Sequence, residues 1–536
     1  MTSQVSIRSY LNQAYLLGLL MVAVGLTLSP FLMGMSQFWL AGVWIIDGIV
    51  AKDFKQKLSR FWHNKAAVLL VAFYLMHVVG LLWTSDFEYA LKDLRVKLPI
   101  LVMPFVLSSM EPLDRKRFNF VMLVYVLSVF VATLFSSVSY WRHDYEDVRE
   151  ISHFISHIRF CLNIAFCIAI SGYYIFKMRV SKGEGVPAFG AKVAVNQFLM
   201  WFLLLWFVYQ IYIFESLSGY VALAAVVTVS VVYAFLRWKK GRGWRVALAV
   251  LALAVIVTGF LVIWHEMKPL LKVEPVDFAQ LEQKTAQGND YWHDTIHNPV
   301  EDGKYVGLYY CRKELQEAWP QRSAMPLNDT LEATLARYLT SKDLRKDAQG
   351  VMSLTDEDIQ NIEQGVANYN NWRHPGLRAR LSATLFEYDL YRHYNNPNGG
   401  SLSQRIEFTR ASFHIIGQHP WFGVGTGDVP QAFAQAYDDI HSPLKDEFRF
   451  RAHNQYLAIA VAFGLIGLAL FLFVLLYPWF SSRNRHTYLS LVFLTIMLLS
   501  MFPEDTLETQ AGAMLFAFFE ALLLFAMPQK SADVQP

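Results

Sequence analysis

The sequence predicts an all-α polytopic membrane protein with about twelve transmembrane helices and one large, mostly helical insertion. Three observations support this fold class. The 536 residues are 54% hydrophobic and only 17% charged, which is too apolar for an ordinary soluble protein. Apolar runs close to the length of about 20 residues that a span needs recur along the chain. Lys and Arg gather in alternate connecting loops, as they do when a chain crosses a membrane repeatedly.

Twelve apolar segments are predicted to span the membrane. They are 14–33, 36–50, 66–84, 97–110, 118–140, 157–177, 196–214, 217–236, 244–264, 454–478, 486–502 and 508–527. The first of these has no small-residue cleavage site and further spans follow it, so we expect a span rather than a cleaved signal.

Basic residues determine the expected orientation. The loops 51–65, 111–117, 178–195, 237–243 and 479–485 carry Lys and Arg, and they are alternate loops of the predicted topology. Because basic loops stay in the cytoplasm, both termini are expected there and the long polar segment 265–452 outside. That segment is too long for a structureless loop, and stretches such as "LNDTLEATLARYL" look helical. We therefore expect spans one to nine in 1–264, an external domain in 265–452, and spans ten to twelve in 453–536.

Five groups of polar residues fall on the predicted outer side. Ionisable groups at membrane depth are costly, so their gathering on one side indicates a site. The groups are Asp93, Arg95 and Lys97; His153, His157 and Arg159; Glu215, Ser216 and Ser218; Arg405, Arg410, His453 and Asn454; and Glu504, Asp505 and Glu508.

The sixth span begins with a polar stripe. If the helix already starts at Ser152, then Ser152, Ser156, Arg159 and Asn163 share one face. Such a stripe faces protein or a water-filled cavity rather than lipid. The alternative is that Arg159 only reaches for the lipid headgroups. His153 and His157 have a spacing that could hold a metal, but no third ligand accompanies them.

The tenth span begins with a histidine and carries small residues below it. His453, Ala460, Gly464 and Gly467 share a face, and small residues let another helix approach closely. We therefore expect His453 at the head of a packed seam. The alternative is a residue at the mouth of the helix, beside the capping residue Asn454.

The chain before this span reads as a short helix that ends ahead of Pro420, followed by a glycine-rich turn. Arg410 shares a face with Ile406 and Phe413, so it points towards the protein if that face does. The glycines of "GVGTG" allow tight turns that could bring the chain back over the membrane. In "PEDTLE", at 503–508, the carboxylates are expected at a helix start, where the helix dipole favours negative charge.

These residue types suit one kind of chemistry. Guanidinium groups make bidentate contacts with phosphate oxygens, which fits a diphosphate. An imidazole can take a proton from an attacking hydroxyl. Together they favour group transfer from a lipid diphosphate to a hydroxyl acceptor, with the arginines stabilising the leaving diphosphate.

The run "RASFHIIGQHPWFGVGTGD…RAHNQYLAIAVAFGLIGL" resembles the shared signature of the bacterial O-antigen ligase and O-antigen polymerase superfamily. The pattern is an arginine, an aromatic residue, HPxxGxG and a HNxYL helix with glycines, and here it covers residues 405–470. "HIRF" at 157–160 and "KLPILVMP" at 97–104 are similar to it as well. The resemblance implies a GT-C-like, inverting glycosyltransferase without metal or cofactor. It would sit in the bacterial inner membrane and move a glycan from undecaprenyl diphosphate to a hydroxyl acceptor on the periplasmic face.

On this resemblance, Arg159 and Arg410 would bind the diphosphate and His453 would act as the general base. One departure is that many members have Ser-Arg-Gly where this chain has Ser218-Gly219-Tyr220, with Glu215 nearby. The residues expected to add substrate contacts are Lys97, Arg95, His157, Glu215, Arg405, Asn454 and Glu504.

Several functions stay open. A ligase with lipid A-core as the acceptor is favoured because the single large loop lies late in the chain, but a polymerase or a protein O-glycosyltransferase has the same frame. A transporter would place ionisable residues near the middle of the membrane. A sensor built around 265–452 would not need Arg159 or His453. The net charge of +3 gives no reason to expect a nucleic-acid partner.

Overall fold

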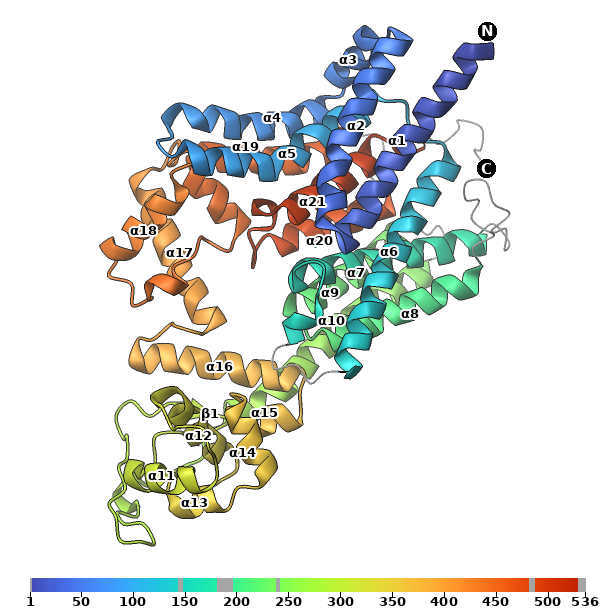
Figure 1. Ribbon diagram of the computed structural model, residues 1–536. Coiled ribbons are helices and arrows are strands. Elements are labelled where there is room, and N and C mark those ends of the chain that lie inside the picture. Colours follow the sequence, from blue (N-terminus) through green and yellow to red (C-terminus); the bar gives the residue numbers. More distant parts are fainter. Residues whose placement is uncertain (1, 143–147, 181–195, 238–241, 482–486, 529–536) are drawn as a thin grey trace. The chain divides into compact units, whose positions relative to one another are not determined.

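The computed structural model describes residues 2–142, 148–180, 196–237, 242–481 and 487–528 (Figure 1). The predicted basic loops 178–195, 237–243 and 479–485 lie mostly outside these ranges. Regular structure in the described part is helical apart from one small antiparallel sheet, in which β1 (Val300–Glu301) pairs with β2 (Lys304–Tyr305).

The chain divides into two compact units. Unit 1 consists of Met1–Ala249, Thr409–Ile440 and Phe450–Pro536, and unit 2 of Val250–Phe408 and His441–Arg449. The predicted domain 265–452 therefore supplies residues to both units.

Helices make up most of unit 1. They are α1 (Thr2–Leu28), α2 (Pro30–Ala51), α3 (Phe54–His63), α4 (Lys65–Val79), α5 (Phe87–Ser109), α6 (Arg115–Arg142), α7 (His157–Val180), α8 (Gln197–Ile213), α9 (Leu217–Arg237), α18 (Val429–Asp439), α19 (Gln455–Ser481), α20 (Tyr488–Ser500) and α21 (Gln510–Leu524). Two further helices cross the boundary between the units, α10 (Arg242–Leu270) and α17 (Ser401–Gln418).

The helical class is confirmed, and the apolar helices agree with the predicted polytopic character. Among the described residues, seven helical segments are long and apolar enough to cross a membrane, and α8, α20 and α21 are shorter apolar helices. Each of the twelve predicted spans overlaps a helix, although the number twelve itself stays a prediction.

The bounds of the first predicted span are wrong, because 14–33 runs across a break between α1 and α2. Ser29 adopts an extended conformation and its side chain accepts a hydrogen bond from the Leu32 amide. Pro30 follows as the first residue of α2, where its missing N–H costs nothing. The chain therefore turns at residue 29, within the apolar run.

Three helices of unit 1 position the site. In Figure 1, α4, α5 and α19 lie side by side, and α21 packs against α5. Three short 3-10 turns lie beside helices of this unit: η1 (Gly80–Trp83) follows α4, η2 (Val148–Ile151) precedes α7, and η6 (Thr506–Glu508) precedes α21.

Helix α19 is broken at Gly464, which has φ 65° and ψ −167°. The glycine-rich loop fills the break. The amides of Val424 and Gly425 donate to the carbonyls of Val461 and Ala462, at 3.0 and 2.9 Å. The released amides of α19 donate in turn, Leu465 to Pro420 and Ile466 to Trp421, at 2.7 and 3.4 Å. Backbone groups freed inside an apolar helix need such partners, so the loop and the break stabilise each other.

The contacts of these small residues therefore differ from the predicted helix–helix seam. A Cβ at Gly464 would meet the backbone of Trp421 at 2.3 Å, so the close partner is a loop rather than a helix. Gly467 does come near another helix, with the sulfur of Met76 in α4 3.5 Å from the position of its Cβ. Sequence spacing could not distinguish the two, since both need a missing side chain.

The same loop is anchored to the turn after α4. The hydroxyl of Thr426 donates to the carbonyl of His77 at 2.6 Å. The Asp428 carboxylate accepts from the amides of Ser85 and Asp86 at 2.8 to 3.0 Å. The loop is thus fixed to α4, α5 and α19 at once.

Unit 2 is built from short helices around its own core. Its helices are α11 (Arg312–Ala318), α12 (Asp329–Ser341), α13 (Ala348–Met352), α14 (Asp356–Glu363), α15 (Tyr369–Arg373) and α16 (Leu377–Tyr394), with 3-10 turns η3 (Phe278–Gln280), η4 (Trp319–Gln321) and η5 (Asp446–Phe448). Fully buried core residues are Leu315, Trp319, Leu335, Tyr338, Leu339, Val351 and Ile362. The helix predicted from "LNDTLEATLARYL" is confirmed as α12, and Asn328 caps it by accepting from the Leu331 amide.

Candidate functional site

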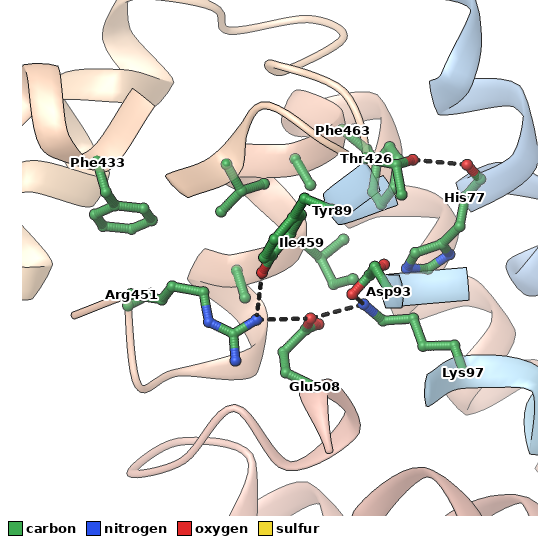
Figure 2. A pocket seen from close by; sticks show the side chains of 14 residues that line it. His77, Tyr89, Asp93, Lys97, Thr426, Phe433, Arg451, Ile459, Phe463 and Glu508 are labelled. Carbon is green, nitrogen blue, oxygen red and sulfur yellow. Dashed lines mark hydrogen bonds and ion pairs between the residues drawn. The ribbon is translucent and has the colours of Figure 1, made fainter. Parts of the chain in front are cut away.

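A buried lysine lies at the centre of the ionic cluster of unit 1. Lys97 Nζ is 2.5 Å from Asp93 Oδ1, one turn earlier on α5, and 2.6 Å from Glu508 Oε2 in η6 (Figure 2). The lysine side chain is 3% exposed, and the two carboxylates are 8% and 9% exposed. Both of its contacts are charge-assisted hydrogen bonds, so the Lys97 charge is matched inside the protein.

Arg451 extends this cluster towards the surface. Its guanidinium donates to the Tyr89 hydroxyl at 3.0 Å and to Glu508 at 3.4 Å, and it lies 3.3 Å from Asp505. Burial opposes its charge, but Glu508 and Asp505 outweigh that effect and raise the pKa of Arg451. Arg451 therefore stays charged beside these two carboxylates.

A small cavity adjoins the cluster on its inner side. Its volume is about 20 Å³, and Figure 2 shows His77, Asp93, Lys97, Arg451 and Glu508 around it. That is room for about one water molecule and not for a phosphate or a sugar. A substrate must therefore meet the cluster from the other side, where a third of the Arg451 side chain is exposed.

His453 stands at this exposed side, two residues before α19. Its Nδ1 is 3.9 Å from a carboxylate oxygen of Glu504 and equally far from one of Asp505. The imidazole is 34% exposed, whereas the two acids are almost completely buried. Burial raises the pKa of Asp505. The backbone at His453 has φ 44°, a left-handed conformation that non-glycine residues adopt rarely and often at functional sites.

The predicted cap beside His453 is observed. The Asn454 side chain accepts from the Leu457 amide at 3.0 Å and donates to the Phe502 carbonyl at 2.9 Å. It therefore ties the start of α19 to the segment that carries Glu504 and Asp505. Those two acids precede η6 rather than α21, which begins at Gln510 behind the capping residue Thr509, so the expected helix start at 503–508 was too early.

One group of side chains in the described part could hold a metal. His453, Glu504 and Asp505 offer ligand atoms that all lie within 4.8 Å of one another. Three protein ligands of this kind suit a divalent cation. The predicted absence of a metal stays a prediction, and the experiment below tests it.

Arg159 reaches the cluster from α7. This helix begins at His157, so the assumption that it starts at Ser152 is wrong; η2 ends at Ile151 and the chain is irregular between them. The guanidinium still donates to Ser156, at 2.8 Å. Its charge is close enough to interact with those of Glu504, Asp505 and Arg451.

A hydrogen-bonded chain below Arg159 fixes this turn of α7. The Tyr125 hydroxyl of α6 donates to Asn163 at 2.6 Å, and the Asn163 amide group donates to the carbonyl of Arg159 at 2.7 Å. Asn163 is 2% exposed, so its polar group is satisfied within the helix bundle. This explains the asparagine deep in the span without assigning it to substrate.

Two other predicted residues, His157 and Glu215, lie at the segment that joins α8 and α9. The imidazole ring of His157 lies 5.2 Å from the ring of Phe214, the neighbour of Glu215. Glu215 has φ 46°, the second predicted site residue in a left-handed conformation. Its charge interacts electrostatically with Tyr140 near the end of α6 and with Tyr220 near the start of α9.

Three predicted arginines have different surroundings. Arg95 is exposed on α5, on a different side of the helix from Lys97. Arg410 is exposed too, and Phe413 on its face is 61% exposed, so the condition for an inward-pointing side chain is not met. Arg405 belongs to the part of α17 that lies in unit 2.

Sequence reasoning left Arg451, a central residue of the cluster, out of the candidate site. Arg451 begins the segment that contains His453, and its position two residues before the histidine was the available signal. Its importance depends on Glu508 and Tyr89, which are 57 and 362 residues away in the chain. No local pattern reveals such partners.

The apolar helices and the buried ionic cluster fit a helical membrane protein with a polar site. Comparison with protein families makes this more specific. Residues 351–472 match the family model Wzy_C, described as O-Antigen ligase, which confirms the resemblance stated above. The matched segment contains α17, the glycine-rich loop, Arg451, His453 and the break in α19. No curated protein gives a match to the chain.

Proposed function

We propose that this protein is an O-antigen ligase-like glycosyltransferase. It moves a glycan from undecaprenyl diphosphate to a hydroxyl acceptor on the periplasmic face of the bacterial inner membrane, with lipid A-core as the favoured acceptor. The family match supports a lipid-linked glycan as the substrate. The observation that carries the proposal is the arrangement at His453: an imidazole that is one-third exposed beside two buried carboxylates, with Arg451 and Arg159 within electrostatic reach of them.

His453 is the general base of this proposal. Its imidazole accepts the proton of the acceptor hydroxyl as the hydroxyl oxygen attacks the anomeric carbon of the donor sugar. Glu504 and Asp505 then stabilise the imidazolium by Coulombic attraction. A new C–O bond forms, the bond from the anomeric carbon to the phosphate oxygen breaks, and the diphosphate leaves with the electron pair. One in-line displacement inverts the anomeric configuration.

The arginines stabilise the leaving group. Arg159 and Arg410 are the proposed diphosphate contacts, and we add Arg451 to them because its guanidinium is partly exposed and lies 3.3 Å from Asp505, which also adjoins His453. Lys97 receives a supporting role instead. Its charge is already matched by Asp93 and Glu508, so it positions Glu508, which in turn holds Arg451.

Two related activities are alternatives. An O-antigen polymerase would use a lipid-linked glycan as the acceptor, and a protein O-oligosaccharyltransferase would use a Ser or Thr hydroxyl. The same base and arginines serve all three, so the identity of the acceptor decides among them.

The test uses purified protein in detergent with an undecaprenyl-diphosphate-linked glycan and three acceptors: lipid A-core, a second lipid-linked glycan and a Ser/Thr peptide. We expect transfer to lipid A-core that persists in EDTA. His453→Ala should lower kcat at least 100-fold, whereas the matched control His374→Ala, an exposed histidine of unit 2, should not.

Three results would count against the proposal. Full activity of His453→Ala would remove the base, and loss of transfer in EDTA would instead favour a metal held by His453, Glu504 and Asp505. No transfer to any acceptor by wild-type protein that binds the donor would refute the enzymatic function.

A further inference from the structure

Unit 2 has an open hollow that lies outside the ionic cluster of unit 1. Its volume is about 470 Å³, within the range of about 300 to 1,000 Å³ typical of small-molecule sites. Seven consecutive or nearby residues line it: Asn289, Asp290, Trp292, Tyr310, Cys311, Arg312 and Lys313. The motifs that suggested group transfer do not include any of these residues.

Two aromatic residues form the apolar part of the hollow. Trp292 and Tyr310 exchange backbone hydrogen bonds, at 2.8 and 3.0 Å, which holds the two residues opposite each other. Their rings are 6.1 Å apart at an angle of 87°, so the edge of one ring meets the face of the other. The indole of Trp292 nevertheless remains 59% exposed. An exposed tryptophan held by backbone pairing offers a large, rigid apolar face to a ligand.

The polar residues of the hollow are held in place by their own partners. Lys313 Nζ donates to the amide oxygen of Asn289 at 3.2 Å, and the Asn289 amide group donates to Glu314 at 2.7 Å. Arg312 donates to Glu332 at 3.2 Å and to Asp329 at 2.7 Å. Fixed donors and acceptors lower the entropic cost of binding a ligand with several hydroxyl groups.

The charges around the hollow do not favour an anion. Arg312 is paired with two carboxylates, and Asp290 is an acid paired with Lys284 at 2.5 Å. Two of the three charged residues of the lining, Asp290 and Arg312, are therefore compensated, which weakens the positive field available to a phosphate. The hollow suits an uncharged ligand with one apolar face and a rim of hydroxyls. A pyranose ring has both, because its axial C–H bonds lie on a face and its hydroxyls point outwards.

We propose that this hollow is a saccharide subsite, with Trp292 as the stacking platform and Asn289, Arg312 and Lys313 as contacts for sugar hydroxyls. It rests on the proposed function in one respect, namely that the saccharide belongs to the donor or the acceptor of the transfer reaction. The subsite would hold part of a long glycan away from the reacting bond, which adds affinity without touching the reacting atoms.

The test is saturation-transfer difference NMR on the full-length protein in nanodiscs. The probes are the methyl glycosides of glucose, galactose, mannose, rhamnose and N-acetylglucosamine at millimolar concentration. We expect saturation of the ring protons of at least one probe, reduced at least tenfold by Trp292→Ala. Trp292→Phe should keep most of the signal. The matched control is Trp372→Ala, at a 37% exposed tryptophan of α15 outside the hollow, and it should leave the signal unchanged.

A second variant guards against loss of folding. Lys313→Ala lies on the exposed rim of the hollow and should also weaken the signal while the thermal unfolding profile stays that of the wild type. Absence of saturation for every probe, or equal signals from wild type and Trp292→Ala, would overturn the proposal. Glycan transfer without probe binding would remove the subsite and leave the proposed function standing. Probe binding through Trp292 without any glycan transfer would support the subsite and refute the proposed function.

Discussion

Replacing Lys97 by methionine should destabilise unit 1 strongly. Methionine keeps most of the volume of the lysine stem but removes the charge that Asp93 and Glu508 share, both within 2.6 Å of Nζ. Glu508 keeps Arg451 and Gln455 as partners, whereas Asp93 loses its counter-ion inside the protein. Breaking a buried pair by removing one partner costs about 3–5 kcal/mol, and the exposed fractions of 3% to 9% place this pair in that class.

The free energy of unfolding can be measured by SDS titration in mixed micelles, followed by tryptophan fluorescence. Arg95→Met is the matched control, because Arg95 lies two residues earlier on the same helix and is exposed. Its effect should stay within about 0.5 kcal/mol. Adding Asp93→Asn to Lys97→Met should recover at least half of the loss, because the stranded carboxylate disappears. Equal unfolding free energies for Lys97→Met and Arg95→Met would refute the reasoning.

Two further predictions concern pH and the broken helix. Burial lowers the pKa of Lys346 in unit 2 to about 7. Between that value and its ordinary 10.5 the unfolded chain binds more protons than the folded one, so the free energy of unfolding of the wild type rises with pH. Lys346→Met lacks this titration, so the difference in melting temperature by which it exceeds the wild type should shrink between pH 7 and pH 9 in thermal unfolding. Gly464→Ala should lower the free energy of unfolding by about 3 kcal/mol or more, because alanine is strained at φ 65° and its Cβ would lie 2.3 Å from Trp421. The control Gly42→Ala, with open space around it, should leave that free energy unchanged in the same SDS titration.

Hydropathy predicted most of the helical framework. Each predicted span overlaps a helix, because a run of apolar residues of that length has few other stable conformations in a membrane. The turn at Ser29 was missed because a serine and a proline change the mean hydropathy of a window very little. The break at Gly464 was missed for a related reason, since a glycine fits a close helix contact and a left-handed backbone equally well.

The candidate site was predictable only in part. Charge patterning indicated which loops share a side, and this grouped Lys97, His453 and Glu508 before their contacts were known. It could not show that Lys97 already has two carboxylate partners, one of them 411 residues away. It also passed over Arg451, whose partners lie in α5 and η6. Long-range ion pairs depend on how helices pack, and no local pattern determines that.

The break in α19 has a mechanical consequence for His453. A continuous helix would carry any tilt of its lower half to its upper end, and helices tilt when the bilayer becomes thinner or thicker. Here the nine residues from Gln455 to Phe463 are separated from the lower half by the left-handed turn at Gly464 and clamped by the loop that bonds to α4, α5 and α19. The upper half therefore moves with the helices around it and not with its own continuation. We therefore expect the geometry around His453 to change little with the thickness of the surrounding membrane.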